Sequence, residues 1–107
     1  MANTRAKFET AREMAFGDID SVMTQIGDPF DDNFGILWVQ NFTDVYIDFS
    51  ISFDGATVTF SLEPLGKLSA DLYTNTLEVS AGEAAWCQYR DGAPSEGFVQ
   101  VSVVVKA

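Results

Sequence analysis

The sequence predicts an all-β protein, a single antiparallel β-sandwich that is jelly-roll-like and carries an extended N-terminal arm. Phe, Tyr, Val, Ile and Thr dominate residues 34–105, and these residue types are enriched in strands. Apolar and polar residues alternate through much of this region, as in half-buried strands. Turn residues recur every ~8–12 positions, which is typical of sandwiches and small barrels. The length of 107 residues fits one domain, with an arm over residues 1–15 and a sandwich over 16–107.

The first element after the arm, within residues 18–27, has two interpretations. Four apolar residues fit helical spacing, and Gly27 would end such a helix. These residues are Ile19, Val22, Met23 and Ile26. A broken strand would instead place Val22, Thr24 and Ile26 on one side. The pattern alone favours neither, because periodicity resolves short segments poorly. Residues 28–33 are predicted to form a loop.

The next elements are a strand and a hairpin. Within residues 35–42, apolar side chains occur at both odd- and even-numbered positions, so we expect this strand to be buried on both faces. Residues 45–62 predict a β-hairpin with its turn at Asp54-Gly55. One face of its first strand is apolar, comprising Val45, Ile47, Phe49, Ile51 and Phe53. On the second strand, Val58, Phe60 and Leu62 alternate with polar residues.

Further strands are predicted at 68–72, 77–79, 84–90 and 98–105, with a loop over residues 91–97. The last of these strands places alternate valines on one face. We expect the core to depend on four residues in particular, which are Trp38, Phe49, Phe60 and Val101.

Composition excludes several function classes. The net charge of −10 repels phosphate backbones, so direct nucleic-acid binding is not expected. The chain has no histidine, which removes Ser-His-Asp and Cys-His nucleophiles and every histidine-containing metal site. A single cysteine, Cys87, cannot form an internal disulfide. No stretch has the pattern of a signal peptide or a membrane span. We therefore expect synthesis in a reducing cytoplasm, no membrane contact and no cofactor.

Charge is distributed unevenly along the chain. Residues 1–12 contain three basic side chains and one acid, for a charge of +2, whereas the other 95 residues sum to −12. A basic arm on an acidic body predicts subunit contacts made by Arg5, Lys7 and Arg12. The alternative is an ordinary solvated terminus.

Other candidate sites are weak. Asp28, Asp31 and Asp32 lie close together, but their spacing does not match a calcium loop, so a solvated acidic turn is the better interpretation. Cys87 sits beside Trp86 in an alternating strand and is expected to be a small buried hydrophobe. The larger aromatic residues are expected in the core or at a subunit interface, with a sugar-stacking platform as the alternative. These residues are Trp38, Tyr46, Tyr73, Trp86 and Tyr89.

From residue 12 onward, the order of short motifs resembles that of small virion proteins of tailed bacteriophages. The motifs that carry the resemblance are Ala15-Phe16-Gly17-Asp18-Ile19, Ile26-Gly27-Asp28-Pro29, Asn41-Phe42-Thr43-Asp44, Asp54-Gly55, Asp71 with Asn75, and Gly97-Phe98-Val99-Gln100-Val101-Ser102. They are mostly turn and strand positions, so the resemblance implies a shared fold more than shared chemistry. It also tips residues 18–27 toward a strand.

The resemblance implies a non-catalytic structural component of the virion, not an enzyme. Such a component would assemble as a symmetric homo-oligomer at the head–tail connector or neck, or on the capsid surface. Its other partners would be portal, neck, tail or capsid proteins. The alternative hypothesis is a carbohydrate- or receptor-binding β-sandwich module, for which exposed tryptophan or tyrosine is required.

Overall fold

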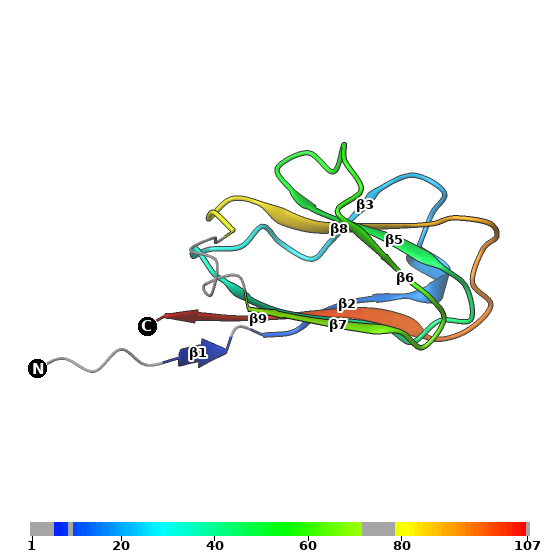
Figure 1. Cartoon of the computed structure of the whole chain (residues 1–107). Helices are drawn as coiled ribbons and strands as arrows, with labels where there is room; N and C mark the ends of the chain where they lie inside the picture. The colour runs from blue at the N-terminus through cyan, green and yellow to red at the C-terminus, as the bar shows by residue number, and fades with distance from the viewer. Residues whose placement is uncertain (1–5, 9, 72–78, 107) are drawn as a thin grey trace, which may run out of the picture.

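Two antiparallel sheets pack face to face in the computed structural model, which describes residues 6–8, 10–71 and 79–106 (Figure 1). The first sheet contains β1 (Ala6–Phe8), β2 (Arg12–Ala15), β9 (Phe98–Lys106), β4 (Ile36–Asn41) and β7 (Lys67–Asp71). The second sheet contains β3 (Thr24–Ile26), β8 (Ala84–Tyr89), β5 (Ile47–Ser52) and β6 (Phe60–Leu62). A short 3-10 turn, η1 (Phe16–Asp18), follows β2.

The strand pairs are nested along the chain. β5 pairs with β6, β4 with β7, β3 with β8, and β2 with β9, and successive pairs alternate between the two sheets. This is the topology of a jelly roll, in which a long antiparallel ribbon is wrapped around a core. The prediction of a jelly-roll-like β-sandwich is confirmed.

The core lies between the sheets and is built from alternate residues of each strand. The three valines of β9 at positions 99, 101 and 103 are fully buried, as the alternation predicts. They pack in one cluster with residues of both sheets, of the 27–35 loop and of the segment after η1, namely Ile19, Ile26, Phe30, Phe34, Leu37, Val39, Ile47, Phe49, Ala85 and Cys87. Phe49 is fully buried and stacks on Phe60 with ring centroids 5.2 Å apart.

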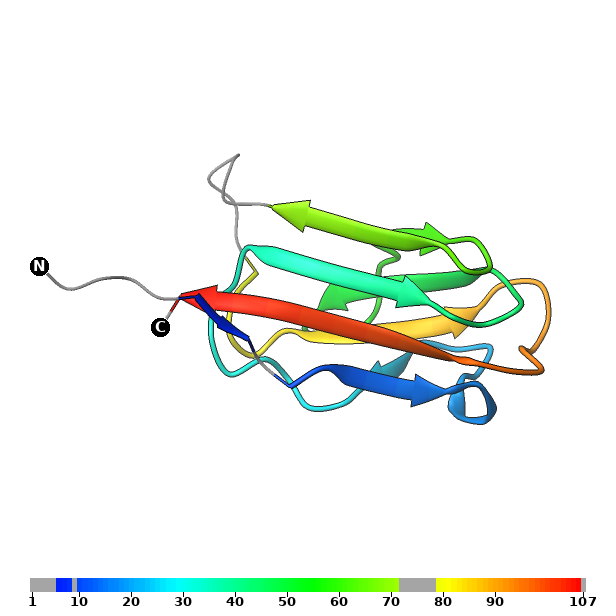
Figure 2. The same cartoon turned by 90° about the horizontal axis from the view of Figure 1, so that it is seen from below.

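The N-terminal segment joins the first sheet. Both β1 and β2 pair with β9, so residues 6–8 and 12–15 of the expected arm belong to the sheet edge (Figure 2). Phe8 pairs with Val104 and Arg12 with Val101. From Phe8 to Arg12 the chain moves four residues, whereas the paired positions on β9, Val104 and Val101, are only three residues apart. The pairing register therefore shifts by one residue between β1 and β2. β2 ends at Ala15, so these two strands of the expected arm are part of the first sheet.

Two expectations for the first half of the chain need correction. β4 is buried on one face only, where Leu37, Val39 and Asn41 point inward, while Trp38 is 39% exposed on the other face. Trp38 is therefore not a core residue. In residues 18–27, only β3 is regular, which agrees with a strand but confines it to three residues. Val22 is exposed and does not share the buried face of Ile26.

The hairpin over residues 45–62 is present. The pairs Ile47–Leu62 and Phe49–Phe60 are centred on Asp54-Gly55, where the turn was predicted. The β5–β6 ladder ends at Phe49, and residues 53–59 form a wider loop over the second sheet. The strands at 67–71, 84–89 and 98–106 agree with the predicted positions. Of the predicted 77–79 strand, Val79 forms an isolated bridge with Phe34, and Leu77 lies outside the described residues.

Candidate functional site

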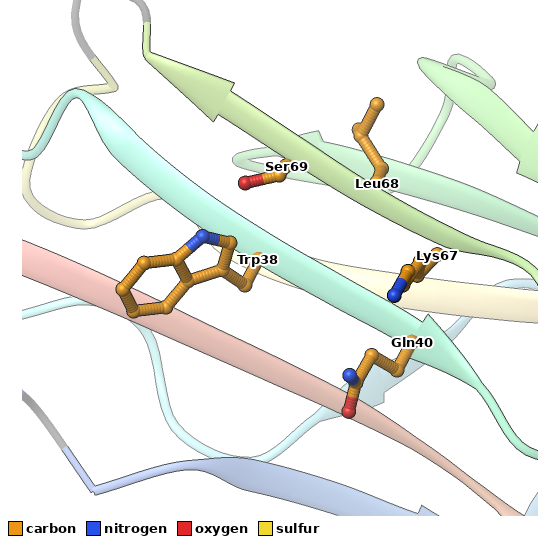
Figure 3. Close-up of a pocket in the computed structure, with 5 residues that line it drawn as sticks. All are labelled: Trp38, Gln40, Lys67, Leu68 and Ser69. Atoms are coloured by element: carbon orange, nitrogen blue, oxygen red, sulfur yellow. The ribbon is translucent and has the colours of Figure 1, made fainter.

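Trp38 stands on the outer face of the first sheet among polar side chains (Figure 3). β4 has a paired strand on each side, so two ladders fix the position of Trp38. Directly across those ladders lie Ser69 on β7 and Ser102 on β9. Figure 3 shows the broad face of the indole ring turned outward from the sheet. The ring is thus an accessible aromatic surface on a rigid central strand.

A hollow of about 510 Å³ adjoins this ring and is lined by Trp38, Gln40, Lys67, Leu68 and Ser69. Its volume lies within the range of small-molecule sites. On the β9 side, Gln100 pairs with Gln40, and its Nε2 donates a hydrogen bond of 3.0 Å to Oε1 of Glu13. Amide, hydroxyl and ammonium groups therefore surround the ring.

Trp86 occupies the outer face of the second sheet but is covered. A Cβ built on Gly55 would lie 2.6 Å from Cδ2 of Trp86, so the 53–59 loop rests directly on the indole ring. Nε1 of Trp86 donates a hydrogen bond of 3.1 Å to the carbonyl oxygen of Ser52. Of the two tryptophans, Trp38 alone is broadly accessible.

A hydrogen-bonded group of polar side chains lies on the outer face of the second sheet, around the carboxylate of Asp48. Asp48 accepts hydrogen bonds from Ser61 Oγ at 2.6 Å, from Gln88 Nε2 at 3.3 Å and from Arg90 Nη2 at 2.8 Å. The Arg90 guanidinium lies 5.3 Å from the ring centroid of Tyr46. Burial alone would raise the pKa of Asp48, but the hydrogen bonds and the charge of Arg90 outweigh it and lower the pKa below 3.8. This arrangement fixes a charged carboxylate and suits structural bracing.

Four loops meet at one end of the sandwich, the right-hand end in Figure 1, which we call the loop end. They are residues 16–23, 42–46, 63–66 and 90–97. Backbone hydrogen bonds join them to one another or to adjoining strands: Phe16 N to Gly97 O, Tyr89 N to Asp20 O, Asn41 N to Gly66 O and Arg90 N to Tyr46 O. The Phe42 and Phe98 rings also pack together, with centroids 4.8 Å apart.

Asn41 holds the loop end together from inside. The side chain is fully buried, and Nδ2 lies 2.9–3.1 Å from the carbonyl oxygens of Val45, Leu62 and Glu63. Its Oδ1 accepts hydrogen bonds from the backbone N and the hydroxyl of Thr43. One amide thus ties the 42–46 loop to the β6–β7 turn.

Apolar side chains gather on the outside of the loop end. The described residues include eight exposed large apolar side chains, of which five lie here, namely Phe16, Val22, Phe42, Tyr46 and Leu65. The same four loops carry six acids against a single cation, Arg90, and these acids are Asp18, Asp20, Asp44, Glu63, Asp91 and Glu96. The loop end is therefore both apolar and negatively charged.

Leu65 is the most exposed of the large apolar side chains, at 77%, and has a φ of 63°. Gly66 N donates a hydrogen bond of 2.8 Å to Glu63 O, which closes a tight turn with Pro64 at its second position and Leu65 at its third. A positive φ at the third position is the feature of a type II turn and favours glycine. A strained leucine at this position therefore projects into solvent at a conformational cost.

The three residues predicted to make subunit contacts, Arg5, Lys7 and Arg12, do not share one environment in the structure. Arg12 is engaged within its own chain, because Nε donates a hydrogen bond of 3.0 Å to Asp28 O and the guanidinium lies 4.3 Å from the Phe30 ring centroid. For Lys7, the structure describes only the backbone, which pairs with Val105. Arg5 lies outside the described residues, as does Tyr73.

The weaker candidates, Cys87 and the three aspartates of residues 28–32, lie among the described residues. Cys87 is fully buried, and desolvation raises the pKa of its thiol to about 12. Asp28, Asp31 and Asp32 form no group suited to a metal ion, and no such group of His, Cys, Asp or Glu occurs elsewhere among the residues described.

The chain matches no protein-family model and no curated protein sequence. Within the described ranges, no helix is long and apolar enough to cross a membrane.

Sequence reasoning did not single out Leu65 or the loop end. The Glu63-Pro64-Leu65-Gly66 stretch contained a usable signal, since proline at the second position favours a tight turn and leaves leucine at the strained third position. The gathering of four loops had no local signal, because it follows from the nested strand order.

Proposed function

We propose that the protein is a non-catalytic structural component of a tailed-phage virion that assembles as a symmetric oligomer. The sequence resemblance supports the virion setting, at the head–tail connector or neck or on the capsid surface. The loop end supports assembly and is the observation that carries it. An exposed apolar patch on a soluble domain marks an interaction surface.

Leu65 strengthens the case for the loop end. The side chain with the greatest apolar exposure is also held at a φ that bulky residues rarely adopt. Glycine would suit the turn better, so folding alone does not explain leucine here. A strained, exposed leucine at this position fits a contact that forms on assembly.

The occupant we propose is the N-terminal segment of a second copy. Residues 1–11, without Arg12, carry a net charge of +1 from Arg5, Lys7 and Glu9, and the four loops of the loop end carry six acids against one cation. β1 runs along the C-terminal half of β9, at the opposite end of the sandwich from the loop end (Figure 2). A contact between opposite ends of neighbouring copies is heterologous, and it generates a closed ring when the rotation between copies closes and an open filament when it does not. We propose the closed ring. A ring suits the connector or neck.

Light scattering on the purified protein at low and moderate salt tests this proposal. We expect a discrete oligomer at low salt that becomes smaller or weaker as salt rises, because exposed charge pairs are screened. The double variant Arg5→Glu/Lys7→Glu should shift the protein toward monomer, whereas Thr57→Glu, which adds a negative charge in the exposed 53–59 loop, should not. Arg12 is left unchanged because it is engaged within its own chain.

Leu65→Gly separates assembly from folding. The variant removes the exposed side chain and relieves the positive φ, so thermal stability should be unchanged or higher while assembly weakens. Phe53→Ala is the matched control, because Phe53 is also highly exposed but lies in the 53–59 loop. This mode of assembly would be refuted if the protein were a monomer at every salt concentration. It would also be refuted if neither the Arg5→Glu/Lys7→Glu variant nor Leu65→Gly changed the size of the oligomer.

A further inference from the structure

The outer face of the first sheet has the chemistry of a ligand site that is separate from the loop end. Its centre is Trp38, whose indole ring is 39% exposed (Figure 3). The face of an aromatic ring carries partial negative charge and attracts the partially positive C–H groups of a ligand stacked on it. A sugar ring presents such C–H groups on its broad face.

Hydrogen-bonding groups surround the ring at the positions set by the strand register. Ser69 and Ser102 lie directly across from Trp38, and Gln40 lies two residues along β4. Gln40 is flanked by Lys67 on β7 and Gln100 on β9. Amides and hydroxyls both donate and accept hydrogen bonds, which matches the hydroxyl groups of a sugar.

We infer that the hollow beside Trp38 binds a neutral oligosaccharide, with one sugar ring stacked on the indole and its hydroxyls bonded to Gln40, Ser69 and Lys67. The hollow of about 510 Å³ has the size of a small-molecule site. The net charge of −10 opposes anionic ligands, which favours an uncharged sugar.

The position of the site argues against an extended peptide. Peptides that bind to sheets usually pair with the backbone of an edge strand. β4 is an inner strand with ladders on both sides, so its backbone is already paired. Recognition on this face is made by side chains alone, and the side chains present are an aromatic ring with polar groups around it.

The two tryptophans provide a specific readout. With two tryptophans in the chain, the ¹H–¹⁵N spectrum should contain two indole signals, one from Trp38 and one from the covered Trp86. We would titrate the whole chain with maltohexaose, cellohexaose and chitohexaose as probes. At least one probe should shift the Trp38 signal saturably and leave the Trp86 signal in place. The Trp38→Phe variant lacks the Trp38 indole signal, so comparing its spectrum with that of the original chain assigns both indole signals.

Two variants complete the test. Trp38→Ala should weaken binding of that probe about tenfold or more, since it removes the stacking surface. Phe53→Ala, which removes an exposed aromatic ring elsewhere, should bind as the original chain does. Retained dispersion of the other amide signals shows that each variant is folded. The inference is overturned if none of the three probes shifts the Trp38 signal saturably, or if Trp38→Ala binds equally well. Because the loop end is not involved, failure here would leave the assembly proposal intact.

Discussion

Gly55 and Trp86 are in such close contact that no Cβ fits at position 55. The φ of Gly55 is +71°, and the indole of Trp86 fills the space beside it. The backbone N of Gly55 donates a hydrogen bond of 2.9 Å to Ser52 Oγ, which holds the loop in place. Gly55 thus fastens the 53–59 loop to the outer face of the second sheet.

Gly55→Ala should lower the free energy of unfolding by about 2–3 kcal/mol, because it combines a strained φ with a clash against the Trp86 ring. Urea unfolding would measure the loss. The control is Gly17→Ala, at a position where a Cβ would meet nothing within 4 Å. Equal unfolding midpoints for the two variants would contradict this role of Gly55.

Asn41→Ala should destabilise the protein by about 2–3 kcal/mol, because several buried polar groups lose their partner. The affected groups include the carbonyls of Val45 and Leu62 and the hydroxyl of Thr43. The neighbouring Gln40→Ala, on the outer face of the same strand, should change stability by no more than about 0.5 kcal/mol. Thermal unfolding of both variants would show the contrast, and a similar loss in Gln40→Ala would argue against it.

Asp48 should make stability depend on pH. Its pKa in the folded protein is below 3.8, so the native state binds fewer protons than the unfolded state as the pH approaches that value. The stabilisation is therefore complete above about pH 5 and is lost as the pH falls through the folded pKa. Asp48→Asn should cost about 1–2 kcal/mol near pH 7, a modest value because Arg90 is half-exposed.

The measurement is the difference in unfolding free energy between the original chain and Asp48→Asn across this pH range. Hydrogen bonds from the side chain and backbone of Ser95 also lower the pKa of Asp44, so Asp44 contributes to the pH dependence of stability. The variant Asp44→Asn measures that contribution separately. A difference between the original chain and Asp48→Asn that stayed constant down to about pH 3 would show that Asp48 does not titrate as described.

Phe49 and Trp38 should respond very differently to truncation. Phe49→Ala removes a fully buried ring stacked on Phe60, so it should cost about 3–5 kcal/mol, enough to unfold many small domains. Trp38→Ala removes a ring from the surface and should cost less than about 1 kcal/mol. Circular dichroism during urea unfolding distinguishes them, and equal losses would return Trp38 to the core.

Alternation predicted the elements whose two faces differ in polarity. The hairpin register is centred on Asp54-Gly55 as expected, because Ile47 and Phe49 must face the core together. The early separation of β5 and β6 could not be predicted, since it reflects the contact between Gly55 and Trp86, which are distant in sequence.

Alternation failed where both faces carry apolar residues. In β4, Trp38 shares its face with Ile36 and Gln40, and hydrophobicity alone suggests burial. The second sheet covers one side of β4, however, and on the other side Trp38 remains 39% exposed. The resemblance motif Asn41-Phe42-Thr43-Asp44 proved informative about structure, because Asn41 and Thr43 are buried and bonded to each other.

The placement of β9 has a consequence for the way the protein acquires its fold during synthesis. β9 lies between β4 and the β1–β2 edge, and Arg12 pairs with Val101. A ribosome therefore releases both neighbours of β9 well before β9 itself, and the nascent first sheet lacks this inner strand until residues 98–106 have been made. Pairing over such sequence separations is slow. Until β9 is inserted, the unpaired edges and apolar faces of the nascent chain are open to aggregation, so we expect folding to be sensitive to chaperone supply.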